Sequence, residues 1–261
     1  MANLNKLIAN DFILAKKRLL QMHFESGVGH IGGNLSALDA MLIVFHEHLK
    51  IGDKFILSKG HAAGALYITL WSMGRLSEED LNQFHHDNTL LPGHPPSRVF
   101  PDIPFATGSL GHGLSLAAGT ALAFRLKGNQ NRVVCLTSDG EWQEGSTWEA
   151  LIFACHHNLI NLSIMVDHNN LQGFGLTTDV ASMSPLWEKL KSFDVDLQVI
   201  DGHSAEEIRA AIDSKQERLQ VIILRTIKGH GVSFMENRME WHYLPLSESQ
   251  FKIAQNEIEC K

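Results

Sequence analysis

The chain has 261 residues, of which 44% are hydrophobic and 20% charged, a globular composition that excludes disordered, collagenous and fibrous classes. Its formal net charge is −7 and Lys and Arg form no block, so we expect no nucleic-acid partner. The chain also lacks a long uninterrupted apolar run and a signal-peptide pattern at its start, so we expect no membrane partner and a soluble, cytoplasmic protein.

The first third of the chain predicts helices. Apolar residues recur at helical spacing from Leu4 to Phe24, with Lys and Arg between them, and a second apolar run covers residues 35–49. Ser77 followed by three acidic residues is typical of a third helix start. Residues 90–104 are rich in Pro and His, which predicts a loop.

Four short Val-, Ile- and Leu-rich runs, separated by segments of helical period, dominate the rest of the chain. Such alternation predicts an α/β fold with a parallel sheet flanked by helices, because strands covered on both faces are apolar throughout. No repeat or linker-like segment interrupts the pattern, so we place residues 1–261 in one domain. The predicted strands are 133–137, 162–166, 197–200 and 221–226.

Polar clusters follow the first two of these strands directly. Asp139 and Gly140 follow the first, and Asn169 follows the second about 30 residues later, which suits one strand–helix–strand unit. Ligands of parallel sheets bind outside the carboxyl ends of the strands, so we expect Asp139 and Asn169 to lie side by side. Either cluster alone is more typical of an ordinary loop, but the pair indicates Mg²⁺ holding a diphosphate.

Two other local patterns have simpler interpretations. Ser146 and Glu149 are spaced as a capping box at the start of a helix. Residues 27–32 form a literal GxGxxG with Asp53 beyond it, as in a dinucleotide site, but a helical pattern precedes it rather than a strand. We therefore do not favour nicotinamide binding. The three cysteines show no CxxC spacing and predict neither a disulfide framework nor a thiolate metal site.

Asp139-Gly140, Glu144-Gly145 and Asn169 together resemble the thiamine-diphosphate motif, and the surrounding sequence is similar to transketolases. The resemblance covers nearly the whole chain and rests on six motifs in the family's order. Besides the metal motif they are Ser26–Leu35, Leu57–His61, Pro92–Pro95, Thr107–Gly113, and Thr226–Val232 with Trp241-His242.

The resemblance implies the fold of the domain that binds the diphosphate of thiamine diphosphate. It also implies which residues contact the cofactor. Asp139, Asn169 and the main-chain carbonyl of Leu171 match the ligands of the divalent metal, which is Mg²⁺ or else Ca²⁺ or Mn²⁺. The predicted cofactor-binding residues are His61, Gly108, Ser109, Leu110, Asp139, Gly140, Asn169, Leu171 and His242.

The resemblance also implies the reaction, transfer of a two-carbon ketol unit from a ketose or ketose phosphate to an aldose. His30, His94 and His242 match positions that orient the donor and relay protons, which suits imidazole near neutral pH. Glu144 and Glu149 match acidic positions near the subunit contact that connect active sites. These assignments account for some of the 15 histidines, a large number for a chain of this length.

The chain matches only the first domain of a transketolase. The resemblance therefore implies the N-terminal subunit of a split enzyme, active only with a separate C-terminal, pyrimidine-binding subunit in an assembly of two copies of each chain. Two alternatives stay open: another two-chain thiamine-diphosphate enzyme, such as a 2-oxo acid dehydrogenase component or an acyloin synthase, and a non-catalytic assembly subunit. Departures from the family at His112, Tyr243 and residues 98–104 leave the sugar substrates open, and Ser138 replaces a usual glycine.

Overall fold

The centre of the molecule is a five-stranded parallel sheet. The computed structural model describes residues 6–97 and 99–260. The strand order is β1-β2-β3-β7-β6, and every neighbouring pair is parallel. The strands are β1 (Lys54–Leu57), β2 (Val133–Ser138), β3 (Leu162–His168), β6 (Val195–Asp201) and β7 (Leu219–Arg225).

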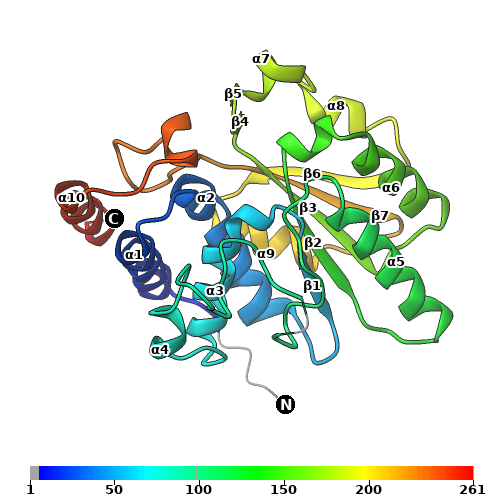
Figure 1. The fold of residues 1–261 in the computed structure, drawn as a ribbon. Coiled ribbons are helices and arrows are strands. Elements are labelled where there is room, and N and C mark those ends of the chain that lie inside the picture. The colour runs from blue at the N-terminus through cyan, green and yellow to red at the C-terminus, as the bar shows by residue number, and fades with distance from the viewer. Residues whose placement is uncertain (1–5, 98, 261) are drawn as a thin grey trace.

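Helices cover both faces of this sheet, as Figure 1 shows. Two separate sets of buried apolar side chains, one on each face, join the helices to the strands. One face carries α1 (Ala9–Ser26), α2 (Ile31–Ile43), α3 (Ala63–Ser72), α9 (Ala205–Asp213) and α10 (Glu248–Glu259). The other carries α5 (Gly113–Leu126), α6 (Gly145–His156) and α8 (Leu186–Leu190).

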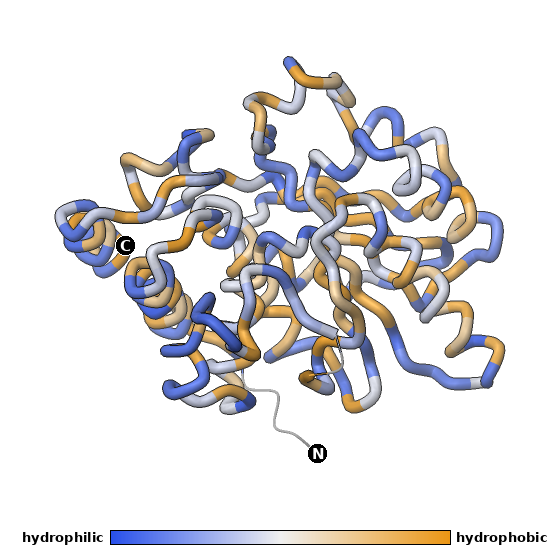
Figure 2. The backbone as a smooth tube through the Cα atoms, viewed as in Figure 1, coloured by the Kyte–Doolittle hydropathy of each residue, from blue (hydrophilic) through white to orange (hydrophobic). Residues whose placement is uncertain are grey.

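Burial explains why the strands form where the apolar runs lie. All six residues of β2 are buried, and so are six of the seven residues of β7. Figure 2 shows hydrophobic residues along the central strands and hydrophilic ones in many connecting loops. The predicted α/β class with a parallel sheet flanked by helices is therefore confirmed.

Several boundaries differ from the predicted ones. α1 begins at Ala9, whereas the predicted start, Leu4, lies outside the described residues, as does Arg98 of the predicted loop. The second helix continues beyond α2 as a π-helix, Val44–His48. β1 was not predicted, because four residues with three apolar side chains are too short to distinguish from other apolar segments.

The predicted capping box is wrong. The N-cap of α6 is Glu144, and no side chain caps this helix. The Ser146 hydroxyl instead donates a hydrogen bond to the carbonyl of Gly111 at 3.0 Å. A tertiary contact between the first turn of α6 and the loop before α5 uses the hydroxyl that local spacing assigned to the helix end. A helix, α1, does precede the GxGxxG segment, which agrees with the rejection of a dinucleotide site.

The carboxyl ends of β1, β2, β3 and β7 lead into the short elements that carry most polar motifs. These are the 3-10 helices Gly60–Ala62, Gly140–Gln143 and Met239–His242, and a small hairpin of β4 (Leu171–Gln172) and β5 (Gly175–Leu176). Two short helices, α4 (Glu78–Leu81) and α7 (Thr177–Ala181), lie outside the main layers (Figure 1). None of the helices in the described part of the chain has the length and apolarity to cross a bilayer.

Candidate active site

A polar cavity of about 230 Å³ lies at the carboxyl edge of the sheet. It brings together motifs that are far apart in the sequence, because parallel strands deliver their following loops to the same edge. Among the predicted site residues, the cavity is lined by His30, His61, His94, Gly108, Leu110, Asp139, Gly140, Asn169, Leu171 and His242.

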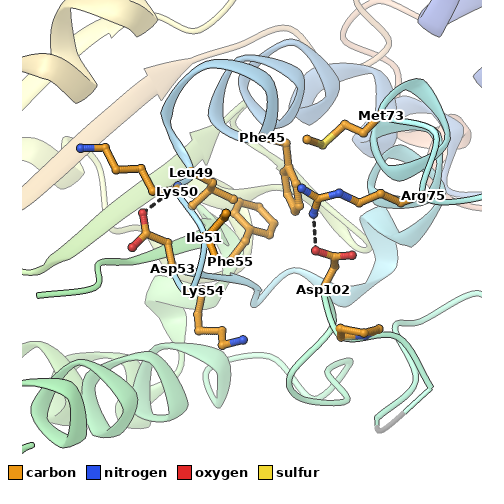
Figure 3. A pocket seen from close by; sticks show the side chains of 12 residues that line it. Phe45, Leu49, Lys50, Ile51, Asp53, Lys54, Phe55, Met73, Arg75 and Asp102 are labelled. Carbon is orange, nitrogen blue, oxygen red and sulfur yellow. Dashed lines mark hydrogen bonds and ion pairs between the residues drawn. The ribbon is translucent and has the colours of Figure 1, made fainter. Parts of the chain in front are cut away.

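A larger cavity of about 580 Å³ lies at the other end of β1 and has a different character (Figure 3). Phe45, Phe55 and Met73 give it an apolar wall, and an ion pair between Arg75 and Asp102 stands at its rim. None of the predicted site residues lines it. We therefore take the smaller, polar cavity as the candidate active site.

The predicted metal ligands leave neighbouring strands, and main-chain N–H groups position their side chains. β2 and β3 are adjacent, with Ser138 opposite Asp167, so Asp139 and Asn169 leave the sheet at the same level. The Asp139 carboxylate accepts hydrogen bonds from the main-chain N–H groups of Gly140, at 2.8 Å, and Asn170, at 2.5 Å. The Asn169 amide oxygen accepts one from the N–H of Leu171 at 3.0 Å.

The charge environment of Asp139 fits a bound cation. Burial, and next the neighbouring Asp167 carboxylate, raise the pKa of Asp139 from 3.8 to about 7. A carboxylate in this position is costly unless a positive charge lies beside it. Asp139, the Asn169 amide and the Leu171 carbonyl offer the oxygen ligands that Mg²⁺ prefers, so the residues fit the predicted metal.

Four histidines from four segments surround the cavity. The ring centroid of His30 lies 5.8 Å from His61, 6.1 Å from His94 and 5.0 Å from His242. His30 is the N-cap of α2, His61 follows β1, His94 lies in the predicted loop and His242 ends a 3-10 helix. The distant motifs that carry these histidines therefore converge on one site.

Burial keeps these imidazoles neutral near pH 7. It lowers the pKa of His30 from 6.5 to about 4, with His94 adding to the effect, and that of His242 to about 3, with Lys228 adding to it. Burial and then Lys59 hold the pKa of His61 well below its usual value, and burial lowers that of His94. A neutral imidazole has one donor and one acceptor, so the cluster can hold hydroxyl and carbonyl groups in either sense.

Lys228 is a site residue that the sequence motifs did not single out as functional. It is 2% exposed, lines the cavity and donates a hydrogen bond to His242 Nδ1 at 2.9 Å. Burial, and next Lys59, lower its pKa from 10.5 to about 8. The ion pairs found among the described residues include none for Lys228, so its charge suits an anionic ligand such as a diphosphate. Its signal was a single lysine shortly after a buried strand.

A buried ion pair between Lys59 and Asp167 joins the elements that carry the site residues. Both side chains are almost fully buried, and Asp167 also accepts hydrogen bonds from Ser36 and Thr226. Burial opposes ionisation of Asp167, but Lys59 and these hydroxyls lower the pKa of this carboxyl. The pair joins β1, β3, α2 and the segment after β7, so it aligns elements that supply site residues.

Glu141 fixes the glycine-rich loop before α5. Its buried carboxylate accepts hydrogen bonds from the N–H groups of Gly111, at 3.0 Å, and Ser138, at 2.9 Å, and from the Ser58 hydroxyl. Gly108 of the same loop has φ 151°, and a Cβ added there would lie 3.0 Å from the ring of His94. The glycine thus lets the main chain of this loop approach the His94 ring closely.

Three predicted site residues lie outside the lining of this cavity: Ser109, Glu144 and Glu149. All three are exposed. Glu144 and Glu149 stand at the start of α6. Their predicted place at a subunit contact stays a prediction, as do the individual roles of the lining residues.

His23 is a buried histidine behind the cavity, and we expect it to make the protein less stable in mild acid. Burial lowers its pKa from 6.5 to about 4, so between these values the unfolded chain binds a proton that the folded chain does not. Stability from this group is therefore lost as pH falls from 6.5 toward 4. We expect it to account for about 2 kcal/mol of the free energy of unfolding lost between pH 7 and pH 5.

The measurement is urea unfolding of the wild type and of His23→Gln at both pH values. Other buried histidines contribute equally to both proteins, so the difference between the two pH dependences isolates His23. Equal pH dependences would contradict the assignment.

The fold and the cavity together define an α/β protein with a polar binding site at the carboxyl edge of a parallel sheet. The chain belongs to the transketolase family, because the family's "Transketolase, thiamine diphosphate binding domain" matches residues 11–260. This confirms the resemblance drawn from the motifs: the chain is the N-terminal, thiamine-diphosphate-binding part of a transketolase.

The chain is similar to proteins of its own length. A Clostridium species has a 6-deoxy-6-sulfo-D-fructose transketolase subunit that is 36% identical over 256 residues, covering 94% of this chain and 93% of the relative. One of the subunits of apulose-4-phosphate transketolase from Actinobacillus succinogenes is 34% identical over 241 residues, covering 88% of this chain and 87% of the relative.

It is also similar to part of a larger solved structure. Transketolase from Campylobacter jejuni superposes with a TM-score of 0.85 at 28% identity over 96% of this chain. The chain spans only 42% of the length of that transketolase.

Proposed function

We propose that this chain holds thiamine diphosphate through a divalent cation, Mg²⁺, bound by Asp139, Asn169 and the carbonyl of Leu171. The observation that carries the proposal is the buried Asp139 carboxylate, raised in pKa to about 7, in contact with the Asn169 segment. Lys228 supplies positive charge for the diphosphate in the same cavity. His61, Gly108, Leu110 and Gly140 line the cavity and would contact the cofactor, with Ser109 beside them.

In this proposal the protein takes part in transfer of a two-carbon ketol unit from a ketose or ketose phosphate to an aldose. When bound, thiamine diphosphate supplies the nucleophilic carbon and stores the electrons of the broken C–C bond. The chain's own residues bind and orient the sugar and exchange protons with it. His30, His94 and His242 are neutral, and the ring centroids of His94 and His242 lie within 6.1 Å of that of His30. Lys228 orients His242 through its Nδ1 atom.

A separate pyrimidine-binding subunit completes the site. The support is that relatives named as transketolase subunits are matched over 93% and 87% of their length, whereas a solved transketolase is matched over 42%. We propose that residues 1–261 form one domain, in an assembly of two copies of each chain. Glu144 and Glu149 are exposed and free to meet a neighbouring subunit there.

The proposal covers sugars of a specialised metabolic pathway as well as those of central sugar metabolism. Relatives of this chain's length are named for a sulfo-sugar and for apulose 4-phosphate. The cavity wall here includes Tyr243, one of the departures from the family. Sugar selectivity is therefore to be measured with more than one ketose.

Mixing experiments test the function. The purified chain with thiamine diphosphate, Mg²⁺, a ketose and an aldose is expected to give no turnover, and addition of the pyrimidine-binding subunit to restore it. Coupled detection of the aldose released from the donor measures the rate. Full activity of the chain alone would overturn the two-subunit proposal, and activity with 2-oxo acids in place of ketoses would overturn the ketol-transfer assignment.

A further inference from the structure

Tyr243 forms part of the cavity wall immediately after His242. Its side chain is 53% exposed and lines the cavity on the solvent side. Its hydroxyl donates a hydrogen bond to the carbonyl of Gly173 at 2.9 Å. Gly173 lies between β4 and β5, directly after the strand that carries Leu171. The tyrosine thus joins the 3-10 helix at His242 to the tip of the hairpin.

The hairpin tip accommodates this contact only because residue 173 is glycine. A Cβ added at Gly173 would lie 2.5 Å from Tyr243 Oη and 3.4 Å from Nε2 of His242. The rings of Tyr243 and His242 meet edge to face, with centroids 4.8 Å apart. The hairpin, the tyrosine and the histidine therefore form one continuous side of the cavity.

The backbone around Tyr243 is also fixed in place. A Cβ at Gly29 would overlap the carbonyl of Tyr243, so residues 29 and 243 are packed main chain against main chain. The N–H of His30 donates to the carbonyl of His242 at 3.1 Å, and that of Tyr243 to the carbonyl of Glu240 at 3.0 Å. The main chain at residue 243 is therefore fixed. The ring is held by its contact with His242 and by the hydrogen bond of its hydroxyl to Gly173, which limit its freedom to move aside for a ligand.

Alongside the histidines, this wall limits the space for a substrate. His30 and His242 are the groups proposed to orient the sugar, and Tyr243 stands beside His242 and is half exposed to solvent. Asp139 and Lys228 line the same cavity and are assigned to the cofactor. A sugar chain running from the histidines past the hairpin would meet the tyrosine ring.

We propose that Tyr243 is a specificity-determining residue, whose ring sets how long and wide a sugar acceptor the site admits between His242 and the hairpin tip. The inference rests on the proposed ketol transfer and adds the residue that selects the substrate. A fixed ring selects by excluding bulk, so its removal should favour larger acceptors. The hydroxyl has a lesser part, since it anchors the hairpin by one hydrogen bond.

The test compares Tyr243→Gly with Tyr243→Phe in the complex reconstituted with the pyrimidine-binding subunit. One ketose donor is kept constant, and the acceptors are two-carbon glycolaldehyde and five-carbon ribose 5-phosphate. In Tyr243→Gly we expect the ratio of kcat/KM for the larger over the smaller acceptor to rise about tenfold, mainly through KM. Tyr243→Phe keeps the ring and should keep the ratio within about threefold of the wild type.

Leu244→Ala is the matched control, because Leu244 is the next residue, is 48% exposed and does not line the cavity. It should leave the ratio unchanged. Calorimetric titration with thiamine diphosphate and Mg²⁺ should give the wild-type affinity for all three variants. If the wild type is active but the kcat/KM ratio is unchanged in Tyr243→Gly, the inferred role of Tyr243 is overturned and the proposed function stands.

Loss of cofactor binding in Tyr243→Gly would also overturn the inference, since it would make the tyrosine a support of the hairpin rather than a selector. A wild-type complex that binds no cofactor or transfers no ketol unit would instead overturn the proposed function, and the inference with it. The two failures are thus told apart by the wild-type measurements.

Discussion

Replacing Asp139 by asparagine is expected to abolish binding of thiamine diphosphate with Mg²⁺ and, with it, ketol transfer by the reconstituted complex. The carboxylate is buried and positioned by two main-chain N–H groups, so it cannot be replaced by a neighbour. Loss of a residue that only hydrogen-bonds a metal ligand already lowers metal affinity about 10- to 100-fold. Loss of a direct ligand should lower it at least as much. Calorimetric titration of cofactor and metal, with turnover measured in parallel, checks this.

The same variant separates binding from folding. Burial and Asp167 raise the pKa of Asp139 from 3.8 to about 7, so the cofactor-free protein loses stability from this group as pH rises between these values, and the full cost is present above pH 7. Asp139→Asn removes that cost, so its free energy of unfolding without cofactor at pH 8 should equal or exceed the wild-type value. Asp201→Asn, at the end of β6 and outside the cavity, is the control and should bind cofactor normally. An active Asp139→Asn complex would revive the view of a non-catalytic assembly subunit.

Replacement of Lys59 by methionine is expected to lower the free energy of unfolding by about 3–5 kcal/mol, because it leaves the Asp167 carboxylate buried without its counter-ion. Lys59 and Asp167 have exposed fractions of 1% and 0% for their side chains, so water cannot take the place of the lost charge. Urea unfolding at pH 7.5 measures the loss.

A surface ion pair of the same chemistry provides the control. Lys252 and Glu248 are paired at 2.7 Å on α10, but their side chains are 68% and 72% exposed. Lys252→Met should cost no more than about 0.5 kcal/mol. The double variant Lys59→Met with Asp167→Asn should be less destabilised than the sum of its two single variants, since the uncompensated charge is gone. A Lys59→Met protein as stable as Lys252→Met would show that the buried pair is not what holds these elements together.

The class of fold was predictable because its main signals are local. Four of the five strands of the main sheet coincide with predicted apolar runs, with β7 ending one residue before the predicted end, and the adjacency of β2 and β3 follows from one strand–helix–strand interval. The strand β1 escaped prediction because it is four residues long at the sheet edge. The contact of the Ser146 hydroxyl with the carbonyl of Gly111, 35 residues away in sequence, has no signal in local spacing.

The candidate site was predictable where motifs with spaced glycines and histidines mark it. His30, His61, His94 and His242 were each found as members of a motif, and the structure gathers them around one cavity. Lys59 and Lys228 lie inside two of the motifs and Glu141 follows Asp139-Gly140. None was singled out as a functional candidate, because a single charged residue has no distinctive spacing. Their importance comes from burial and from partners 14 to 108 residues away, as with His242 for Lys228 and Asp167 for Lys59.

From the sequence alone, apolar runs and strand-end motifs predicted an α/β protein with a metal-held diphosphate, because these signals depend on short-range order. The resemblance of its motifs to those of transketolases supplied the family and thiamine diphosphate. The folded molecule added the charge balance and shape of the site: which carboxyl group has a raised pKa, which buried lysine lines the cavity and which ring forms part of its wall. These properties arise from desolvation and from contacts between loops that meet only at the sheet edge. A pattern along one chain does not contain those distances, so packing decides them.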